Sequence, residues 1–310
     1  MPKTCFLITS LICALLFAAG DPPELSLVVL GVAQDAGYPQ AACAKACCKP
    51  AWADPQKRSG ATCLAVVNHS TGSRFMFEAT PHFTDQLRAL DQLHPAKNKP
   101  ILDGIFLTHG HIGHYTGLMQ LGREVMGTKG VPVYAMPRMF TYLSHNGPWS
   151  QLVGLGNIKL QAMSADQPVR PEAGFEVTPL LVPHRDEFTE AVGYRIQGPN
   201  KAVLFIPDID KWALWARGIE TVIRTVDVAY LDGTFYDQAE MPGRNMSDIP
   251  HPFISESLAR FASLPETERS KIRFIHFNHS NPVLDTNSAA AAEVRKAGFA
   301  IAQVGEIIKL

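Results

Sequence analysis

The stretch LTHGHIGHYTGL, from Leu107 to Leu118, contains three histidines within six residues. His109 and His111 are two residues apart, and His114 follows three residues later. The apolar run DGIFLT, which comes just before, is typical of a buried strand. Imidazole nitrogens that converge without partners are costly to bury, so this spacing favours a metal site at the end of a strand. An exposed histidine-rich turn is the alternative interpretation.

Apolar, β-branched segments alternate with helix-like segments along the rest of this 310-residue chain, which is 46% hydrophobic. This alternation predicts a layered α/β protein with two sheets inside. We expect strands in LSLVVLGVA, TCLAVVN, RFMFEAT, DGIFLT, VPVYA, NIKLQAM, FEVTPLLVP, AVGYRIQ, AVLFIPD, VAYLDG and IRFIHF. We expect helices in PHFTDQLRALDQL, TGLMQLGREVM, PRMFTYLS, KWALWARGIETVIRTV, SESLARFASL and DTNSAAAAEVRKAG.

The first 20 residues have the features of a secretory signal peptide. Lys3 is followed by an apolar run over residues 5–17, and the small residues AAG precede Asp21. An uncleaved membrane anchor is the alternative. We therefore expect a mature chain of residues 21–310 that forms one domain and is periplasmic or secreted.

The charge pattern argues against a nucleic-acid partner. The formal net charge is −1, and the sequence has no long basic run of the kind that binds phosphate backbones. After removal of the signal peptide, no other segment is apolar enough to cross a bilayer, so we expect no membrane contact. A small-molecule substrate is the expected partner, and the oligomeric state is left open.

Further candidate ligands follow other predicted strands. His184 lies in LLVPHRDE, Asp208 in LFIPDID and His276 in FIHFNHSNP, each at or just after the end of an apolar run. Functional side chains are often found in loops that a rigid scaffold positions in this way. One such histidine or aspartate is weak evidence for a metal site, but the three residues together are stronger evidence.

The histidine spacing resembles the H-x-H-x-D-H signature of the metallo-β-lactamase superfamily, and the later residues follow in that family's order. The stretches LGVAQDAGYPQAAC, LDGTFYDQAEM and FIHFNHSNPVL are similar to the pyrroloquinoline-quinone biosynthesis protein B group. This similarity runs from Leu30 to about Leu284, although protein B does not carry the full histidine cluster. The resemblance implies a four-layer αββα fold, in which two packed sheets are flanked by helices.

The resemblance also implies metal ligands and an activity. His109, His111 and His184 would hold one metal ion, and His114 and His276 a second, with Asp208 bridging the two. Zinc with an open position lowers the pKa of bound water to about 7, which implies hydrolysis of a phosphodiester, ester, lactone or amide. The alternatives are an iron-dependent oxygenase related to protein B and a non-catalytic metal-binding relative.

Gly113 is the main departure from the family pattern. The family has an aspartate at this position, which binds the second metal and orients the nucleophile, and glycine can do neither. His114, Asp208 and His276 would remain as ligands of a weaker second site. A water molecule or a nearby carboxylate could fill the gap, and the candidates are Asp186, Asp210 and Asp232.

His251 is a candidate general acid. It lies in the longest irregular stretch, YDQAEMPGRNMSDIPHP, and relatives with the same core have a proton-donating histidine in the comparable region. Imidazole titrates near neutral pH and suits this role. A loop histidine without a catalytic part is the alternative.

The sequence CAKACC places Cys43, Cys47 and Cys48 within six residues. The resemblance implies a structural zinc here, with His279 as the fourth ligand. Adjacent cysteines are awkward ligands for one ion, and a disulfide is the alternative in an oxidising compartment. Cys63 lies in a predicted strand and is expected to be a core residue.

Overall fold

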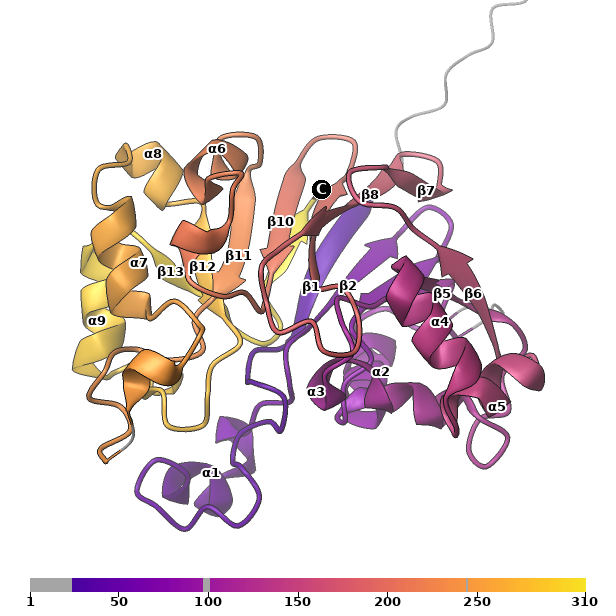
Figure 1. The fold of residues 1–310 in the computed structure, drawn as a ribbon, viewed down its shortest axis with the longest axis horizontal. Helices are drawn as coiled ribbons and strands as arrows, with labels where there is room; N and C mark the ends of the chain where they lie inside the picture. The colour runs from indigo at the N-terminus through magenta and orange to yellow at the C-terminus, as the bar shows by residue number, and fades with distance from the viewer. Residues whose placement is uncertain (1–23, 97–100, 244) are drawn as a thin grey trace, which may run out of the picture.

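The computed structural model describes residues 24–96, 101–243 and 245–310, and the predicted signal peptide lies outside these ranges. Within them, two seven-stranded sheets form the centre of the molecule (Figure 1). The first sheet has the order β14-β1-β2-β3-β4-β5-β6, and the second has the order β13-β12-β11-β10-β9-β8-β7. No helix in the described part of the chain is long and apolar enough to span a bilayer.

Eleven of the fourteen strands in the described ranges follow the predicted apolar segments closely, and three short edge strands were not predicted. The first sheet contains β1 (Leu25–Gly31), β2 (Cys63–Asn68), β3 (Arg74–Phe77), β4 (Gly104–Phe106), β5 (Val131–Ala135), β6 (Ile158–Ala162) and β14 (Ile307–Lys309). The second contains β7 (Val169–Glu172), β8 (Phe175–Leu181), β9 (Val192–Gln197), β10 (Ala202–Ile206), β11 (Val228–Asp232), β12 (Ile272–Ile275) and β13 (Ala300–Ile301).

Helices cover the outer face of each sheet, which confirms the predicted αββα layering (Figure 1). The first sheet is flanked by α2 (Phe83–Leu93), α3 (Ile112–Tyr115), α4 (Pro137–His145) and α5 (Trp149–Gly154). The second is flanked by α6 (Ile219–Ile223), α7 (Ile254–Phe261), α8 (Glu266–Arg269) and α9 (Ala289–Lys296). The short α1 (Lys49–Ala53) lies apart from both groups, at the bottom of Figure 1.

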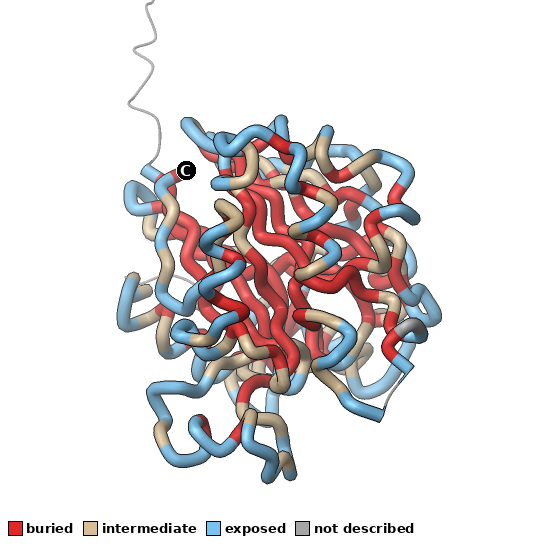
Figure 2. The backbone as a smooth tube through the Cα atoms, turned by 90° about the vertical axis from the view of Figure 1, so that its left-hand side faces the viewer, coloured by how far each residue is buried: buried red, intermediate tan, exposed pale blue. Residues whose placement is uncertain are grey.

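Aromatic side chains fill the space between the two sheets. Phe77 and Phe106 stack with their ring centroids 4.9 Å apart, and Tyr194 of the second sheet meets Phe106 at 5.8 Å. All three side chains are fully buried. Figure 2 shows buried strands throughout the centre of the molecule. Because β4 ends at Phe106, this packing fixes the point from which the histidine turn begins.

Two predicted helices are shorter than expected. In the segment 116–126, α3 begins earlier, at Ile112, and is followed by the 3₁₀ turn η2 (Thr116–Leu121). The amide of Gly117 donates to the carbonyl oxygen of Ala79, and this tertiary contact turns the chain away from a regular helix. In the segment 211–226, Gly218 has a φ of +69°, which separates the 3₁₀ turn η3 (Trp212–Leu214) from α6.

Candidate metal centre

The candidate ligands come from loops at one edge of the two sheets. Strands β10, β11 and β12 are parallel neighbours, and so are β3, β4 and β5. The ends of parallel strands meet at the same edge, so residues that are distant in sequence come together there. The loops concerned carry His109 after β4, His184 after β8, Asp208 after β10, Asp232 at the end of β11 and His276 after β12.

The first cluster contains His109, His111, His184 and Asp208, whose ligand atoms all lie within 4.8 Å of one another. Nδ1 of His111 is 2.8 Å from Nε2 of His109 and 3.3 Å from Nε2 of His184. Ligands of a tetrahedral zinc with Zn–N bonds of about 2.0–2.1 Å lie roughly 3.3 Å apart. The three imidazoles therefore fit one zinc ion without a large rearrangement.

The opposite ring nitrogen of each of these imidazoles has an outer partner. Nδ1 of His109 lies 2.9 Å from the Thr108 hydroxyl, and Nε2 of His111 lies 3.2 Å from the Glu187 carboxylate. Nδ1 of His184 lies 3.0 Å from the Asp210 carboxylate. Partners of this kind fix the tautomer and the ring orientation of metal-ligating histidines.

The second cluster contains His114, His276 and Asp35. Asp35 was not among the candidate ligands predicted from the sequence. Nδ1 of His276 lies 2.9 Å from the Thr234 hydroxyl, and Nδ1 of His114 lies 3.5 Å from a Glu78 carboxylate oxygen. This pair of imidazoles also has one nitrogen directed at the cluster and the other near an outer partner.

Asp208 stands between the two clusters. Its Oδ2 lies 3.2 Å from Nε2 of His184, 3.5 Å from Nε2 of His109 and 3.7 Å from Nε2 of His114. One carboxylate oxygen thus faces imidazoles of both sets. The position is compatible with the predicted bridging role.

His251 approaches the centre from the other side of Asp208. Its Nδ1 lies 2.9 Å from Oδ2 of Asp232 and 3.1 Å from Oδ1 of Asp208. Asp232 is fully buried and held in place, because its Oδ2 also accepts from the amide of Ile209 and its Oδ1 accepts from the Thr234 amide and hydroxyl. The imidazole is therefore positioned by a fixed carboxylate.

The three candidate carboxylates for the gap at position 113 have other partners in the structure. Asp186 is exposed and pairs with Arg138, Asp210 contacts His184, and Asp232 contacts His251. The carboxylate next to Gly113 belongs to Asp35.

The charges of the centre depend on each other. Burial lowers the pKa of His109 and His111, which favours the neutral imidazole that binds metals. Burial also acts to lower the pKa of His184, but the negative charge of Asp208 raises it to about 9. Burial likewise acts to lower the pKa of His251, but the carboxylates of Asp232 and Asp208 raise it well above its usual value. In the metal-free centre, protons and a cation therefore compete for some of the same atoms.

Several buried polar atoms of the centre make no hydrogen bond of normal geometry in the described part of the chain, although four pairs of oppositely charged groups there lie 2.9–3.6 Å apart. These atoms are Oδ1 of Asp35, Oδ1 of Asp208, both carboxylate oxygens of Glu78, both ring nitrogens of His114 and Nε2 of His276. Buried polar groups are normally satisfied, so this concentration at one place points to a missing ligand. A divalent cation fits the donor set of imidazoles and carboxylates.

Two residues at the second cluster, its member His276 and the outer partner Glu78, have strained backbones. His276 has a φ of +69°, and Glu78 has a φ of +84°. Side chains with a Cβ rarely adopt such values, and residues that do are concentrated at functional sites.

The cysteine cluster lies apart from this centre, before α1. The ligand atoms of Cys43, Cys47, Cys48 and His279 lie within 4.8 Å of one another, and all three cysteines are free thiols. The Sγ atoms of Cys43 and Cys47 are 3.8 Å apart, close to the roughly 3.8 Å that follows from tetrahedral zinc with Zn–S bonds of about 2.3 Å. Cys63 is fully buried in β2 and belongs to the core.

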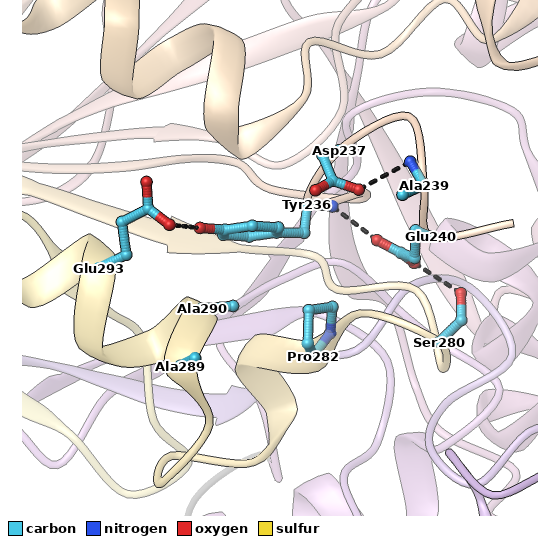
Figure 3. A pocket seen from close by; sticks show the side chains of 9 residues that line it. All are labelled: Tyr236, Asp237, Ala239, Glu240, Ser280, Pro282, Ala289, Ala290 and Glu293. Carbon is cyan, nitrogen blue, oxygen red and sulfur yellow. Dashed lines mark hydrogen bonds between the residues drawn. The ribbon is translucent and has the colours of Figure 1, made fainter.

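Two cavities lie beside the loops of the centre, and neither is lined by the clustered histidines 109, 111, 114, 184 and 276. The smaller, of about 440 Å³, is shown in Figure 3. Within it, Glu240 accepts from the amide of Tyr236 and from the Ser280 hydroxyl, and the Tyr236 hydroxyl donates to Glu293. The bond from Ser280 joins the start of the loop that carries His251 to the loop that follows His276, and the bond to Glu293 joins it to α9.

Comparison with curated proteins gives relatives across nearly the whole chain. A protein named coenzyme PQQ synthesis protein B, from Methylorubrum extorquens (strain PA1), is 26% identical over 310 residues, which cover 92% of this chain and 100% of the relative. A protein of the same name from Xanthomonas euvesicatoria pv. vesicatoria (strain 85-10) is 26% identical over 314 residues, with the same coverage.

Solved structures with similar folds include three that carry named functions or ligands. Zn(2+)-bound PqqB from Methylobacterium extorquens has a TM-score of 0.77 at 24% identity, covering 92% of this chain and 100% of the other. A diphosphatase from the PhnP family has a TM-score of 0.62 at 22% identity, covering 93% and 97%. The short form of human tRNase Z has a TM-score of 0.55 at 16% identity, covering 91% and 98%. These likenesses show the shared fold.

The family model described as "Beta-lactamase superfamily domain" matches residues 73–277, a range that includes the histidine turn and His276. Members of this superfamily are mostly metal-dependent hydrolases. By the extent of this match, together with the two-sheet fold, the chain belongs to the β-lactamase superfamily and is similar to the proteins named PQQ synthesis protein B.

Proposed function

We propose that this protein is a zinc-dependent hydrolase that uses metal-activated water to cleave a phosphodiester, ester, lactone or amide bond in a small molecule. One observation carries the proposal. Each imidazole of the first cluster turns one nitrogen toward a common point and has its other nitrogen near an outer partner. That arrangement is typical of a catalytic metal site with three protein ligands and an open position.

His109, His111 and His184 would hold the ion, which when bound would lower the pKa of a water molecule to about 7. Four other residues support this site by their contacts with the three imidazoles. Thr108, Glu187 and Asp210 keep the three rings directed inward, and Asp208 holds negative charge beside them.

His251 is the proposed proton donor to the leaving group. Its Nδ1 donates to Asp232, so Nε2 is the nitrogen available for proton transfer. Asp232 acts as a positioning residue, because it is buried and its own oxygens are bonded to the amides of Ile209 and Thr234.

A second candidate function is an iron-dependent oxygenation. The cluster of Asp35, His114 and His276 presents two imidazoles and one carboxylate, the ligand set of many non-haem iron oxygenases. The five inward-facing histidines of the two clusters together favour zinc. Metal analysis of protein purified without added metal distinguishes the two candidates, since the second requires iron at this cluster.

The proposed hydrolysis is tested with the zinc-loaded protein and a panel of chromogenic phosphodiester, ester, lactone and lactam substrates. We expect turnover of at least one class, and loss of that turnover in the His109→Ala variant. Zinc-loaded protein that turns over no member of the panel, or a His109→Ala variant with unchanged rates, would favour a non-catalytic metal-binding protein.

We further propose that the cysteine cluster holds a structural zinc. Replacing the buried Cys48 with serine is expected to remove one equivalent of zinc and to lower the melting temperature by roughly 5–10 °C, because structural zinc binding contributes directly to folding. Inductively coupled plasma mass spectrometry and differential scanning calorimetry measure the two effects. Cys63→Ser is the matched control, since this cysteine is equally buried but outside the cluster, and its zinc content should equal that of the wild type.

We also propose that the protein is exported to the periplasm or secreted, that its substrate is a small molecule and that it does not bind nucleic acid. The support is the sequence of residues 1–20 and the formal net charge of −1. Amino-terminal sequencing of the chain recovered after expression should give a start near residue 21. A recovered chain that still begins at residue 1 in the cytoplasm would overturn the proposed export.

A further inference from the structure

Gly113 leaves the second cluster without the carboxylate that position 113 supplies in the family signature, and the structure fills that space with another residue. A Cβ atom built on Gly113 would lie 2.4 Å from Cα of Asp35 and 2.5 Å from both Cβ and Oδ1 of Asp35. These distances are far below van der Waals contact. Any side chain at position 113 would therefore overlap Asp35. Asp35 can occupy this place only because residue 113 is a glycine.

The carboxylate of Asp35 is directed at the two imidazoles of the cluster. Its Oδ1 lies 2.9 Å from Nε2 of His114 and 3.6 Å from Nε2 of His276. The side chains of both histidines are at least 98% buried, and among the described residues no hydrogen bond from outside this group reaches any of the three facing atoms. Two imidazole nitrogens and one carboxylate oxygen that face one another in this way form a ligand set that suits a shared divalent cation.

The backbone holds Asp35 in this place independently of any ion. The amide of Gln34 donates to the carbonyl oxygen of Phe277, and Ala33 bridges to the same residue. The amide of Gly37 donates back to Gln34, which closes a turn around Asp35. The loop after β1 is thus joined to the segment that carries His276.

We propose that Asp35 is the carboxylate ligand of the second metal ion, in place of residue 113, together with His114, His276 and the bridging Asp208. In this chain the carboxylate comes from the loop after β1 and not from the histidine turn, and the glycine at position 113 leaves space for it. This inference rests on the proposed metal-dependent function, because the second ion lies beside the proposed site of water activation.

The test compares Zn²⁺ binding by four variants of the full chain, measured by mass spectrometry and by competition with a chromophoric chelator. Asp35→Asn keeps the shape of the side chain but removes its charge. We expect it to lose one equivalent of zinc, or to bind that equivalent at least about 100-fold more weakly. Mutation of a residue that only hydrogen-bonds to a metal ligand already lowers metal affinity by about 10–100-fold. Gly113→Asp alone should lower the melting temperature because of the overlap with Asp35. The control Asp186→Asn changes an exposed carboxylate outside the cluster and should leave zinc binding unchanged.

The decisive variant combines Asp35→Gly with Gly113→Asp, which returns the carboxylate to the position of the family signature. We expect it to recover the zinc equivalent that Asp35→Asn loses. Wild-type zinc affinity in Asp35→Asn would overturn the inference, and so would a wild-type protein that hydrolyses substrate with zinc at the first cluster alone. If zinc binding follows the predicted pattern but no substrate is turned over, the proposed hydrolase function fails and the assignment of Asp35 stands.

Discussion

Replacing His184 with alanine is expected to remove the zinc ion of the first cluster and to lower kcat/KM for hydrolysis by roughly 10³-fold or more, about 4 kcal/mol of transition-state stabilisation. His184 lies within 3.3 Å of both His111 and Asp208, so its loss opens the ligand set on one side. Without a firmly held ion, water keeps its usual high pKa and no strong nucleophile forms near neutral pH. Steady-state kinetics and metal analysis on the same sample give both results.

The matched control for this prediction is His145→Ala. His145 lies at the end of α4, is exposed and hydrogen-bonds to the carbonyl oxygen of Thr141, so its removal deletes an imidazole without touching either cluster. Its zinc content and rates should match those of the wild type. A His184→Ala variant that retains full zinc content and full activity would show that the ion is held elsewhere.

Replacing His251 with glutamine is expected to lower the rate on substrates with poor leaving groups by roughly 10²–10⁴-fold, the range typical of a lost general acid. The effect should be much smaller on substrates whose leaving group departs without a proton, such as nitrophenolate. This dependence on the leaving group separates proton donation from a structural role, because a disturbed fold would slow both substrates alike. Zinc content should remain that of the wild type, since neither proposed ion is held by His251.

The companion variant Asp232→Asn tests the positioning of His251. Asp232 accepts the bond from Nδ1 of His251, and its replacement by an amide weakens this contact while keeping the shape of the side chain. We expect the same selective loss on poor leaving groups, to a smaller extent. Equal rate losses on both classes of leaving group in the two variants would contradict the proposed proton transfer.

The fold and most of the centre could be predicted from the sequence for a physical reason. Apolar runs mark the buried strands, and polar residues that directly follow them must lie at a sheet edge. His109, His184, Asp208 and His276 all satisfy this pattern, and the structure brings them to one edge. The edge strands β7, β13 and β14 were not predicted, because they have two to four residues each and only partial burial.

Asp35 was missed because its role depends on a tertiary contact. It follows β1, and nothing in its neighbourhood shows that it faces Gly113 and the two imidazoles. The only available signal was the pair formed by a missing carboxylate at position 113 and an acidic residue in a loop after another strand. The outer partners Thr108, Glu187 and Thr234 are ordinary polar residues in sequence, and only the folded chain shows their contacts with the imidazoles.

The convergence of the imidazoles on a metal ion is tested most directly by an anomalous difference map, recorded at the zinc absorption edge, from crystals of the protein purified without added metal. The predicted result is a peak about 2.0–2.1 Å from Nε2 of His109, Nδ1 of His111 and Nε2 of His184, with a second peak beside Asp35 and His114. A map with no peak among the rings of residues 109, 111 and 184 would contradict the metal centre and the hydrolysis proposed from it.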